Sequence, residues 1–127
     1  MKLALDTNRY SDFVRGDLGA ARILEDAEAV YLPLPVLAEL RVGFLGGRRS
    51  RENEAGLARF LRRSGVEVLL PDERTTFHYA SVYHQLRRQG TPIPTNDMWI
   101  AALVLQHGLT LYARDSHFDH LPQIPRA

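Results

Sequence analysis

Short apolar runs alternate with helix-length segments along this chain, and the alternation restricts the fold more than any other feature. The runs at residues 2–5, 30–32, 66–70 and 109–113 fit buried strands because each is short and bounded by turn-forming residues. Strands that alternate with helices favour a parallel sheet covered on both faces. The sequence therefore predicts an α/β fold, with a central, mainly parallel β-sheet flanked by α-helices in a three-layer α/β/α arrangement.

Proline, glycine and capping residues set the expected limits of the helices. Gly46-Gly47, Gly90 and Gly108 are predicted helix stops, and Thr91-Pro92-Ile93-Pro94 is predicted to be an extended loop. Thr95 or Asn96 is the expected cap of the last helix. Helices are expected over residues 11–15, 18–29, 35–45, 50–65, 71–90 and 97–107, with a short edge strand at 123–124.

Length and composition predict one compact domain over residues 1–127. The chain is 45% hydrophobic and has no cysteine, so its core must form without disulfides or thiolate-bound metal. The longest apolar run, residues 98–105, is much shorter than the roughly 20 residues of a membrane span. We expect a soluble, cytoplasmic protein with no membrane partner.

Four carboxylates lie within otherwise apolar stretches: Asp6, Glu39, Asp97 and Asp115. A buried, unpaired charge is costly, so such groups need a cation, a set of hydrogen bonds or access to solvent. Asp6 and Asp115 directly follow predicted strands, and ligands of open parallel sheets collect at the carboxyl ends of strands. Together the four acids predict a divalent-metal site.

Each acid also has a simpler structural interpretation. Asp6 could cap the next helix or form an Asx turn, and Asp115 fits a turn equally well. Asp97 would be stabilised by the helix dipole in a first helical turn. Glu39 is harder to explain in this way, because neither Pro35 nor Gly43, one helical turn away on either side, can pair with it.

Four stretches, in order, closely resemble the motifs of PIN-domain ribonucleases, specifically the toxins of VapBC-type toxin–antitoxin pairs. The stretches are Leu5-Asp6-Thr7-Asn8, residues 37–43 (Leu-Ala-Glu-Leu-Arg-Val-Gly), residues 95–102 (Thr-Asn-Asp-Met-Trp-Ile-Ala-Ala) and residues 113–118 (Ala-Arg-Asp-Ser-His-Phe). The resemblance covers essentially the whole chain. It implies a PIN-like fold, Mg²⁺ or Mn²⁺ dependence and endonucleolytic cleavage of RNA. It also implies a homodimer and inhibition by a cognate VapB-like antitoxin.

The resemblance gives the four acids both catalytic and metal-binding roles. Magnesium prefers oxygen ligands and keeps several waters, which suits such a site, and we expect in-line attack of an activated water on the phosphodiester. The family usually has Thr or Ser two residues before the last acid, whereas this chain has Ala113. One of three supporting residues, Thr7, Asn8 or Asn96, could supply the missing hydrogen bond, or one ligand could be weaker than usual.

Other basic and imidazole side chains have open roles. Net charge is only +1, but Arg48, Arg49 and Arg51 form a cluster that could contact RNA phosphates, as could Arg114. Solvated helix faces carry such charges routinely, and a preference for Arg over Lys can reflect genomic base composition. His117 and His120 lie near Asp115 and suggest a transition-metal ligand or a general base, although a solvated or packing role is favoured.

Two alternative functions belong to other classes. The Ala113 departure is compatible with a catalytically inactive PIN-like binding module. A receiver-type phosphoacceptor domain also places acids and magnesium at the carboxyl end of a parallel sheet, with Asp72 as the phosphorylated residue. That second alternative is disfavoured because the chain lacks paired acids after its first strand, and its one lysine is Lys2.

Overall fold

The computed structural model describes all of residues 1–127 and contains one four-stranded parallel sheet. The strands are β1 (Lys2–Leu5), β2 (Ala29–Pro33), β3 (Val66–Leu69) and β4 (Thr110–Tyr112), and their order across the sheet is β3-β2-β1-β4. Six α-helices connect them: α1 (Thr7–Val14), α2 (Leu18–Asp26), α3 (Leu34–Gly46), α4 (Ser50–Leu61), α5 (Thr75–Gln89) and α6 (Thr95–His107). A 3-10 helix, η1 (Ser116–His120), follows the last strand.

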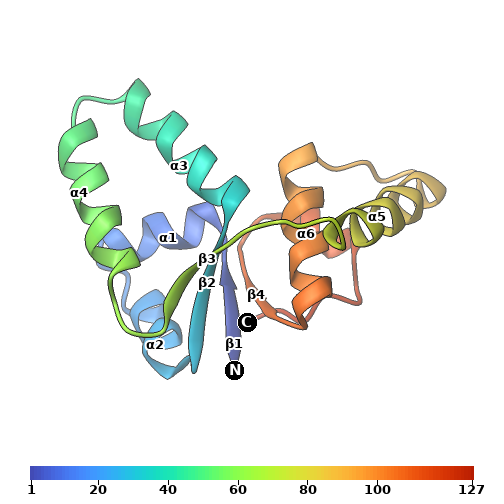
Figure 1. Ribbon diagram of the computed structural model, residues 1–127, viewed down its shortest axis with the longest axis horizontal. Helices are drawn as coiled ribbons and strands as arrows, with labels where there is room; N and C mark the ends of the chain where they lie inside the picture. The colour runs from blue at the N-terminus through green and yellow to red at the C-terminus, as the bar shows by residue number, and fades with distance from the viewer.

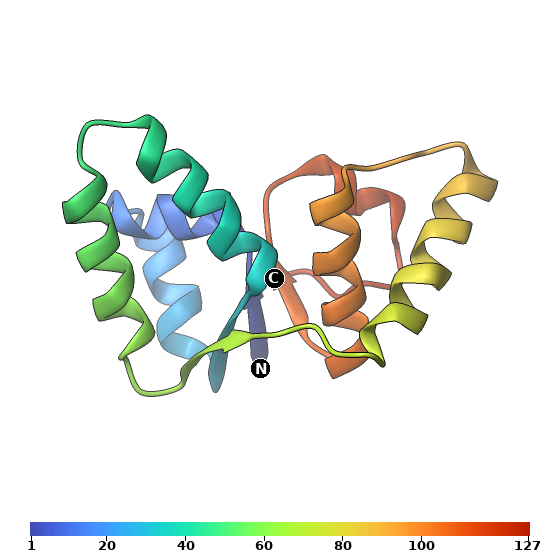
Figure 2. The ribbon, with the colours of Figure 1, turned by 45° about the horizontal axis from the view of Figure 1, so that its top comes forward.

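The helices cover the sheet from both sides, which confirms the predicted α/β class and three-layer arrangement. Figure 1 shows α1 to α4 on one side of the sheet and α5 and α6 on the other, and the second view keeps this division (Figure 2). The strands supply the fully buried centre of the core, including Leu3, Leu5, Leu32 and Leu111. No helix combines the length and the apolar character that crossing a membrane requires.

The sheet changes winding direction between β1 and β4. From β1 the chain adds β2 and then β3 on one side, and only afterwards places β4 on the other side of β1. The backbone N–H of Asp6 donates to the Tyr112 carbonyl at 3.1 Å, so the ends of the first and last strands lie side by side. Such a switch point is where open α/β sheets bind ligands.

Several predicted boundaries shift in the structure. The first helix begins at Thr7 rather than Ser11, α2 ends at Asp26, and Ala29 belongs to β2. The helix α6 begins at Thr95, with Pro94 in the cap position that was expected of Thr95 or Asn96. The edge strand predicted at residues 123–124 is wrong: the only pairing there is an isolated bridge between Leu111 and Arg126.

Asp72, Thr75 and Gln106 form a hydrogen-bonded cluster, called the joint below, at the start of α5. The predicted start at Pro71-Asp72 is wrong by a turn, because Asp72 caps the helix from outside: its Oδ1 accepts the Thr75 N–H at 3.2 Å. The fully buried Thr75 donates from Oγ1 to Gln106 Oε1 at 2.5 Å, and Gln106 donates back to Asp72 at 3.0 Å. The joint fixes α5 against α6.

Candidate active site

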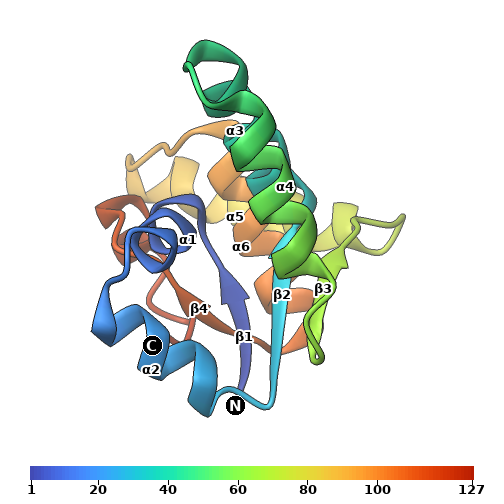
Figure 3. The same cartoon turned by 90° about the vertical axis from the view of Figure 1, so that its left-hand side faces the viewer.

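Four separate elements bring the predicted acids to the carboxyl end of the sheet. Asp6 follows β1 and Asp115 follows β4, Glu39 lies in the second turn of α3, and Asp97 lies in the first turn of α6. The carboxylate of Asp6 is close enough to those of Asp97, Glu39 and Asp115 for their charges to raise its pKa. Residues up to 109 positions apart along the chain therefore share one site. Figure 3 shows α1, α3 and α6 meeting at this end of the sheet.

Asp6 is the most deeply placed of the four acids. Only 5% of its surface is exposed, and although it precedes α1 its side chain makes no capping hydrogen bond. The capping interpretation is therefore wrong for Asp6. Burial raises the pKa of its carboxyl to about 6, opposed by the Thr7 backbone N–H and reinforced by the three neighbouring acids. An ionised Asp6 in this position favours a nearby cation.

Glu39 is held by the residue that follows Asp6. The Thr7 hydroxyl donates to Glu39 Oε1 at 3.1 Å, which joins α1 to α3 across the site. Burial raises the pKa of Glu39, the Thr7 hydrogen bond opposes that shift, and the charges of Asp97 and Asp115 add to it. Thr7 therefore contacts one of the four acids, and its supporting role in the site stays a prediction.

Asp97, Asp115 and His117 form the tightest cluster in the site. His117 Nδ1 lies 2.8 Å from Asp97 Oδ2 and 3.1 Å from Asp115 Oδ1. Burial raises the pKa of Asp97, and the hydrogen bond from His117 opposes the shift. Asp115 also accepts the His117 backbone N–H at 2.9 Å, so it fills the turn role proposed for it while its carboxylate still faces the site.

His117 is the site residue that sequence reasoning undervalued. The signal was its position two residues after Asp115, which the 3-10 turn of η1 converts into direct contact. His120, at the other end of η1, is exposed, and its backbone carbonyl accepts a hydrogen bond from Gln89. The two histidines therefore differ, and only His117 belongs to the site.

The donor set fits a divalent metal ion. Neither Asp6 nor Glu39 takes part in any ion pair with an Arg or Lys, so their charges are not neutralised within the chain. One ligand atom from each of Asp97, Asp115 and His117 lies within 4.8 Å of the others, close enough for one ion. Carboxylate-rich sites with few nitrogen ligands suit Mg²⁺ and Mn²⁺.

The other proposed supporting residues lie further from the chemistry. Asn8 and Asn96 are exposed, and neither makes a side-chain hydrogen bond to the acids. Ala113 is 4% exposed, and its carbonyl accepts from Arg126 Nη2 at 2.8 Å. No hydroxyl replaces the usual Thr or Ser at Ala113, but Thr7 supplies a hydroxyl elsewhere in the site.

Comparisons with known proteins agree with this geometry. The PIN domain family matches residues 3–124. The chain belongs to the PIN-domain family. Ribonuclease VapC2 of Rickettsia felis is 29% identical over 118 residues, covering 92% of this chain and 84% of the relative. Ribonuclease VapC11 of Mycobacterium tuberculosis is 27% identical over 130 residues, covering 96% and 92%.

Solved structures give the same result for the fold. The DNA-bound VapBC complex of Salmonella typhimurium contains a chain with a TM-score of 0.86 and 25% identity, with 100% of this chain and 97% of that chain covered. For VapBC2 of Rickettsia felis bound to a promoter DNA fragment the TM-score is 0.85 at 24% identity, with 100% and 98% covered. The PIN assignment replaces the receiver-type alternative, and Asp72 instead belongs to the joint before α5.

The arginines proposed as RNA contacts fall into two groups in this PIN domain. Arg114 makes a two-pronged ion pair with Asp12 on α1, with Nε and Nη2 each 3.1 Å from a carboxylate oxygen. Arg49 is paired with Glu52 at the start of α4. Arg48 and Arg51 are exposed and form no ion pair, so they remain available to a polyanion.

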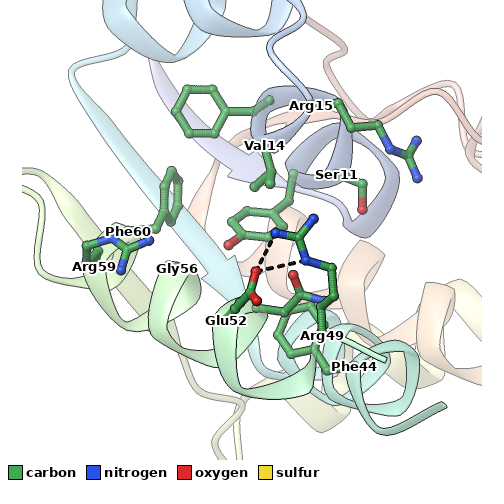
Figure 4. Close-up of a pocket in the computed structure, with 12 residues that line it drawn as sticks. Ser11, Val14, Arg15, Phe44, Arg49, Glu52, Gly56, Arg59 and Phe60 are labelled. Carbon is green, nitrogen blue, oxygen red and sulfur yellow. Dashed lines mark hydrogen bonds and ion pairs between the residues drawn. The ribbon is translucent and has the colours of Figure 1, made fainter. Parts of the chain in front are cut away.

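A groove of about 720 Å³ lies between α1 and the α3–α4 hairpin. Aromatic and charged side chains both line it, and Figure 4 shows Arg15, Arg49 and Arg59 among the charged groups and Phe44 and Phe60 among the apolar ones. The groove contains none of the four acids, so it is a separate surface from the catalytic candidate.

Proposed function

We propose that this PIN domain is a VapC-type endoribonuclease, the toxin of a VapBC toxin–antitoxin pair. The observation that carries the proposal is the convergence of four acids at the switch point of a parallel sheet, with the pKa values of Asp6, Glu39 and Asp97 all raised. A cluster of carboxylates in which no Arg or Lys pairs with Asp6 or Glu39 suits cation-assisted phosphodiester hydrolysis. Relatives that cover most of the chain are named VapC ribonucleases.

Asp6, Glu39, Asp97 and Asp115 are the residues that would hold Mg²⁺ or Mn²⁺. When bound, such an ion supplies Lewis acidity at the phosphate and lowers the pKa of coordinated water. The chain's own groups prepare the site: Thr7 fixes the orientation of Glu39 by its 3.1 Å hydrogen bond, and the backbone of η1 fixes Asp115. Burial of Asp6 excludes bulk water from its carboxylate. The expected reaction is hydrolysis of RNA.

We also propose the partners of the toxin. A VapB-like antitoxin is expected to dock a segment in the groove between α1, α3 and α4, where aromatic groups would take apolar side chains. Arg15 and Arg59, which are exposed and have no ion-pair partner, would pair with acidic side chains of that segment. Solved relatives are toxin–antitoxin complexes, which supports this occupant. The family resemblance implies a homodimer acting in the cytoplasm, and analytical ultracentrifugation of the free protein would test the dimer.

The decisive experiment compares wild type with Asp97→Asn on total RNA, with Mg²⁺, Mn²⁺ or EDTA. We expect internal cleavage by wild type in either metal, none in EDTA, and at least a hundredfold slower cleavage by the variant, equivalent to about 2.7 kcal/mol of lost transition-state stabilisation. Arg22→Gln, on the exposed face of α2, is the matched control and should cleave normally. A folded wild type without RNase activity in either metal would support the inactive binding module instead.

A further inference from the structure

His117 is the one nitrogen ligand that the fold places among the carboxylates. Its Nδ1 is 2.8 Å from Asp97 Oδ2 and 3.1 Å from Asp115 Oδ1, while the backbone N–H of the same residue is fixed on Asp115. The imidazole thus approaches both acids from η1, which is itself packed into the core through the fully buried Phe118. The His117 side chain is nevertheless 41% exposed, so the imidazole contacts both acids at a solvent-accessible edge of the site.

The spacing of these atoms resembles that of neighbouring ligands around one ion. Ligands at about 2.1 Å from a six-coordinate cation lie about 3 Å from one another along each edge of the octahedron. The two nitrogen–oxygen distances, 2.8 and 3.1 Å, fall at that length. A single N–H on Nδ1 can satisfy only one carboxylate oxygen well, whereas a cation would satisfy all three atoms together.

We propose that His117 is a direct ligand of the divalent ion, through Nδ1, and that it makes this site select Mn²⁺ over Mg²⁺. This inference depends on the proposed function, because it takes the acidic cluster to be the metal site. Imidazole favours transition metals, while Mg²⁺ has little affinity for nitrogen and keeps its oxygen shell. A site with one imidazole and several carboxylates should therefore differ more in its affinities for Mn²⁺ and Mg²⁺ than an all-carboxylate site does.

A competing role for His117 gives a different signature. If the imidazole only hydrogen-bonds Asp97 and orients it, the metal would contact oxygens alone. The two roles predict the same loss of activity in a His117 variant, so activity cannot distinguish them. A spectroscopic contact between the nitrogen and the metal can.

The test uses electron spin echo envelope modulation of Mn²⁺ bound to the full-length protein, prepared with natural histidine and with ¹⁵N-histidine. Direct ligation predicts a ¹⁴N coupling that becomes a ¹⁵N coupling on labelling, and that disappears in His117→Gln. His120→Gln, in the same 3-10 helix, is the matched control and should keep it. Mn²⁺ affinity measured by EPR titration should fall about tenfold or more in His117→Gln, and Mg²⁺ affinity measured by competition less than about threefold.

The outcomes separate this inference from the function on which it depends. Mn²⁺ binding without histidine nitrogen coupling, but lost in Asp97→Asn, would overturn the role of His117 and leave the metal-dependent ribonuclease intact. Absence of both Mn²⁺ and Mg²⁺ binding would overturn both, whereas Mg²⁺ binding without Mn²⁺ binding would overturn the role of His117 alone. Circular dichroism will show whether His117→Gln folds. If it does not fold, the test is whether the nitrogen coupling of wild type changes on ¹⁵N-histidine labelling and whether His120→Gln retains that coupling.

Discussion

Asp6 and Asp17 occupy the same position before consecutive helices, yet their carboxylates do different things. Asp17 Oδ1 accepts the Ala20 N–H at 2.8 Å and caps α2, whereas Asp6 makes no capping bond and turns toward the other acids. A cap contributes about 1 kcal/mol to stability. A buried, repelled carboxylate with a raised pKa subtracts from it. The protein therefore keeps Asp6 at a cost in folding free energy.

Replacing Asp6 by Asn should make the metal-free protein more stable while abolishing RNA cleavage. The folded pKa of about 6 lies above the usual 3.8, so at pH 7 the ionised group destabilises the fold by about 1 to 3 kcal/mol. Urea denaturation in EDTA will measure the change. Asp17→Ala, as the control, should lose about 1 kcal/mol and retain cleavage. A less stable Asp6→Asn would contradict the electrostatic account.

The pH dependence of that difference has a defined sign. Because the folded state binds the proton of Asp6 more tightly than the unfolded state, ionisation destabilises the fold as pH rises from about 4 to about 6. The stability advantage of Asp6→Asn over wild type should therefore be absent below pH 4, grow up to about pH 6 and be constant above it. Denaturation curves of both proteins at several pH values check this, and an advantage that shrinks with pH would refute it.

Arg114 and Asp12 should act on cleavage as one unit. Both prongs of the Arg114 guanidinium are held by Asp12, which is only 15% exposed, so the pair fixes the residue next to Asp115 against α1. We expect Arg114→Ala, Asp12→Ala and the double variant to slow RNA cleavage by the same factor, within about threefold. A much larger loss in Arg114→Ala alone would instead assign Arg114 to the RNA.

Among the contacts between helices, the joint before α5 stabilises the packing of α5 against α6. Thr75→Val removes the buried hydroxyl that donates to Gln106 and accepts the Asp72 N–H at 2.9 Å. The unpaired groups should cost about 1 to 3 kcal/mol of unfolding free energy, measured by urea denaturation, with RNA cleavage retained. Thr76→Val, at an exposed neighbour, should change stability by less than about 0.5 kcal/mol. Equal effects of the two variants would refute the joint.

The sequence predicted whether a segment is a helix or a strand better than it predicted the residues at which each helix or strand begins and ends. Apolar spacing and turn-forming residues predicted the six helices and the four strands of the sheet, together with an edge strand at residues 123–124 that is wrong. Gly90 and Gly108 do end α5 and α6 in the left-handed conformation. The first helix was placed four residues late because Asp6 seemed to end a strand and begin a turn. The pairing of Leu111 with Arg126 depends on where the C-terminal segment returns to the sheet, which local sequence does not encode.

The sequence predicts the four acids of the candidate site, and the structure brings their carboxylates near one another, while their roles as metal ligands stay a prediction. Their charge within apolar segments was a sufficient signal for Asp6, Glu39 and Asp97, whose pKa values are indeed perturbed. Thr7 was one of three residues expected to supply a hydrogen bond, but its partner, Glu39, and the imidazole contact of His117 could not be derived, because each contact depends on how two elements distant in sequence approach one another. The spacing of residues along the sequence does not show how two distant elements are oriented toward one another.

For the whole molecule, a net charge of +1 leaves RNA binding to local patches. Arg48 lies on the connection between α3 and α4, Arg51 lies in the first turn of α4, and both are exposed and have no ion-pair partner. Replacing both by Gln should raise the KM for RNA severalfold at low salt and flatten the dependence of kcat/KM on salt, with kcat unchanged. Cleavage kinetics from 50 to 300 mM KCl check this. Arg22→Gln on α2 is the control, and an unchanged salt slope would exclude the pair from RNA contact.

The adjacency of β1 and β4 has a consequence for the synthesis of the protein. Asp6 is translated 91 residues before Asp97 and 109 residues before Asp115. A nascent polypeptide from which β4 has not yet emerged has no strand to place on that side of β1, and so it lacks half of its acids. For the proposed ribonuclease, hydrolysis would begin only once residues 97–115 have left the ribosome and joined the sheet.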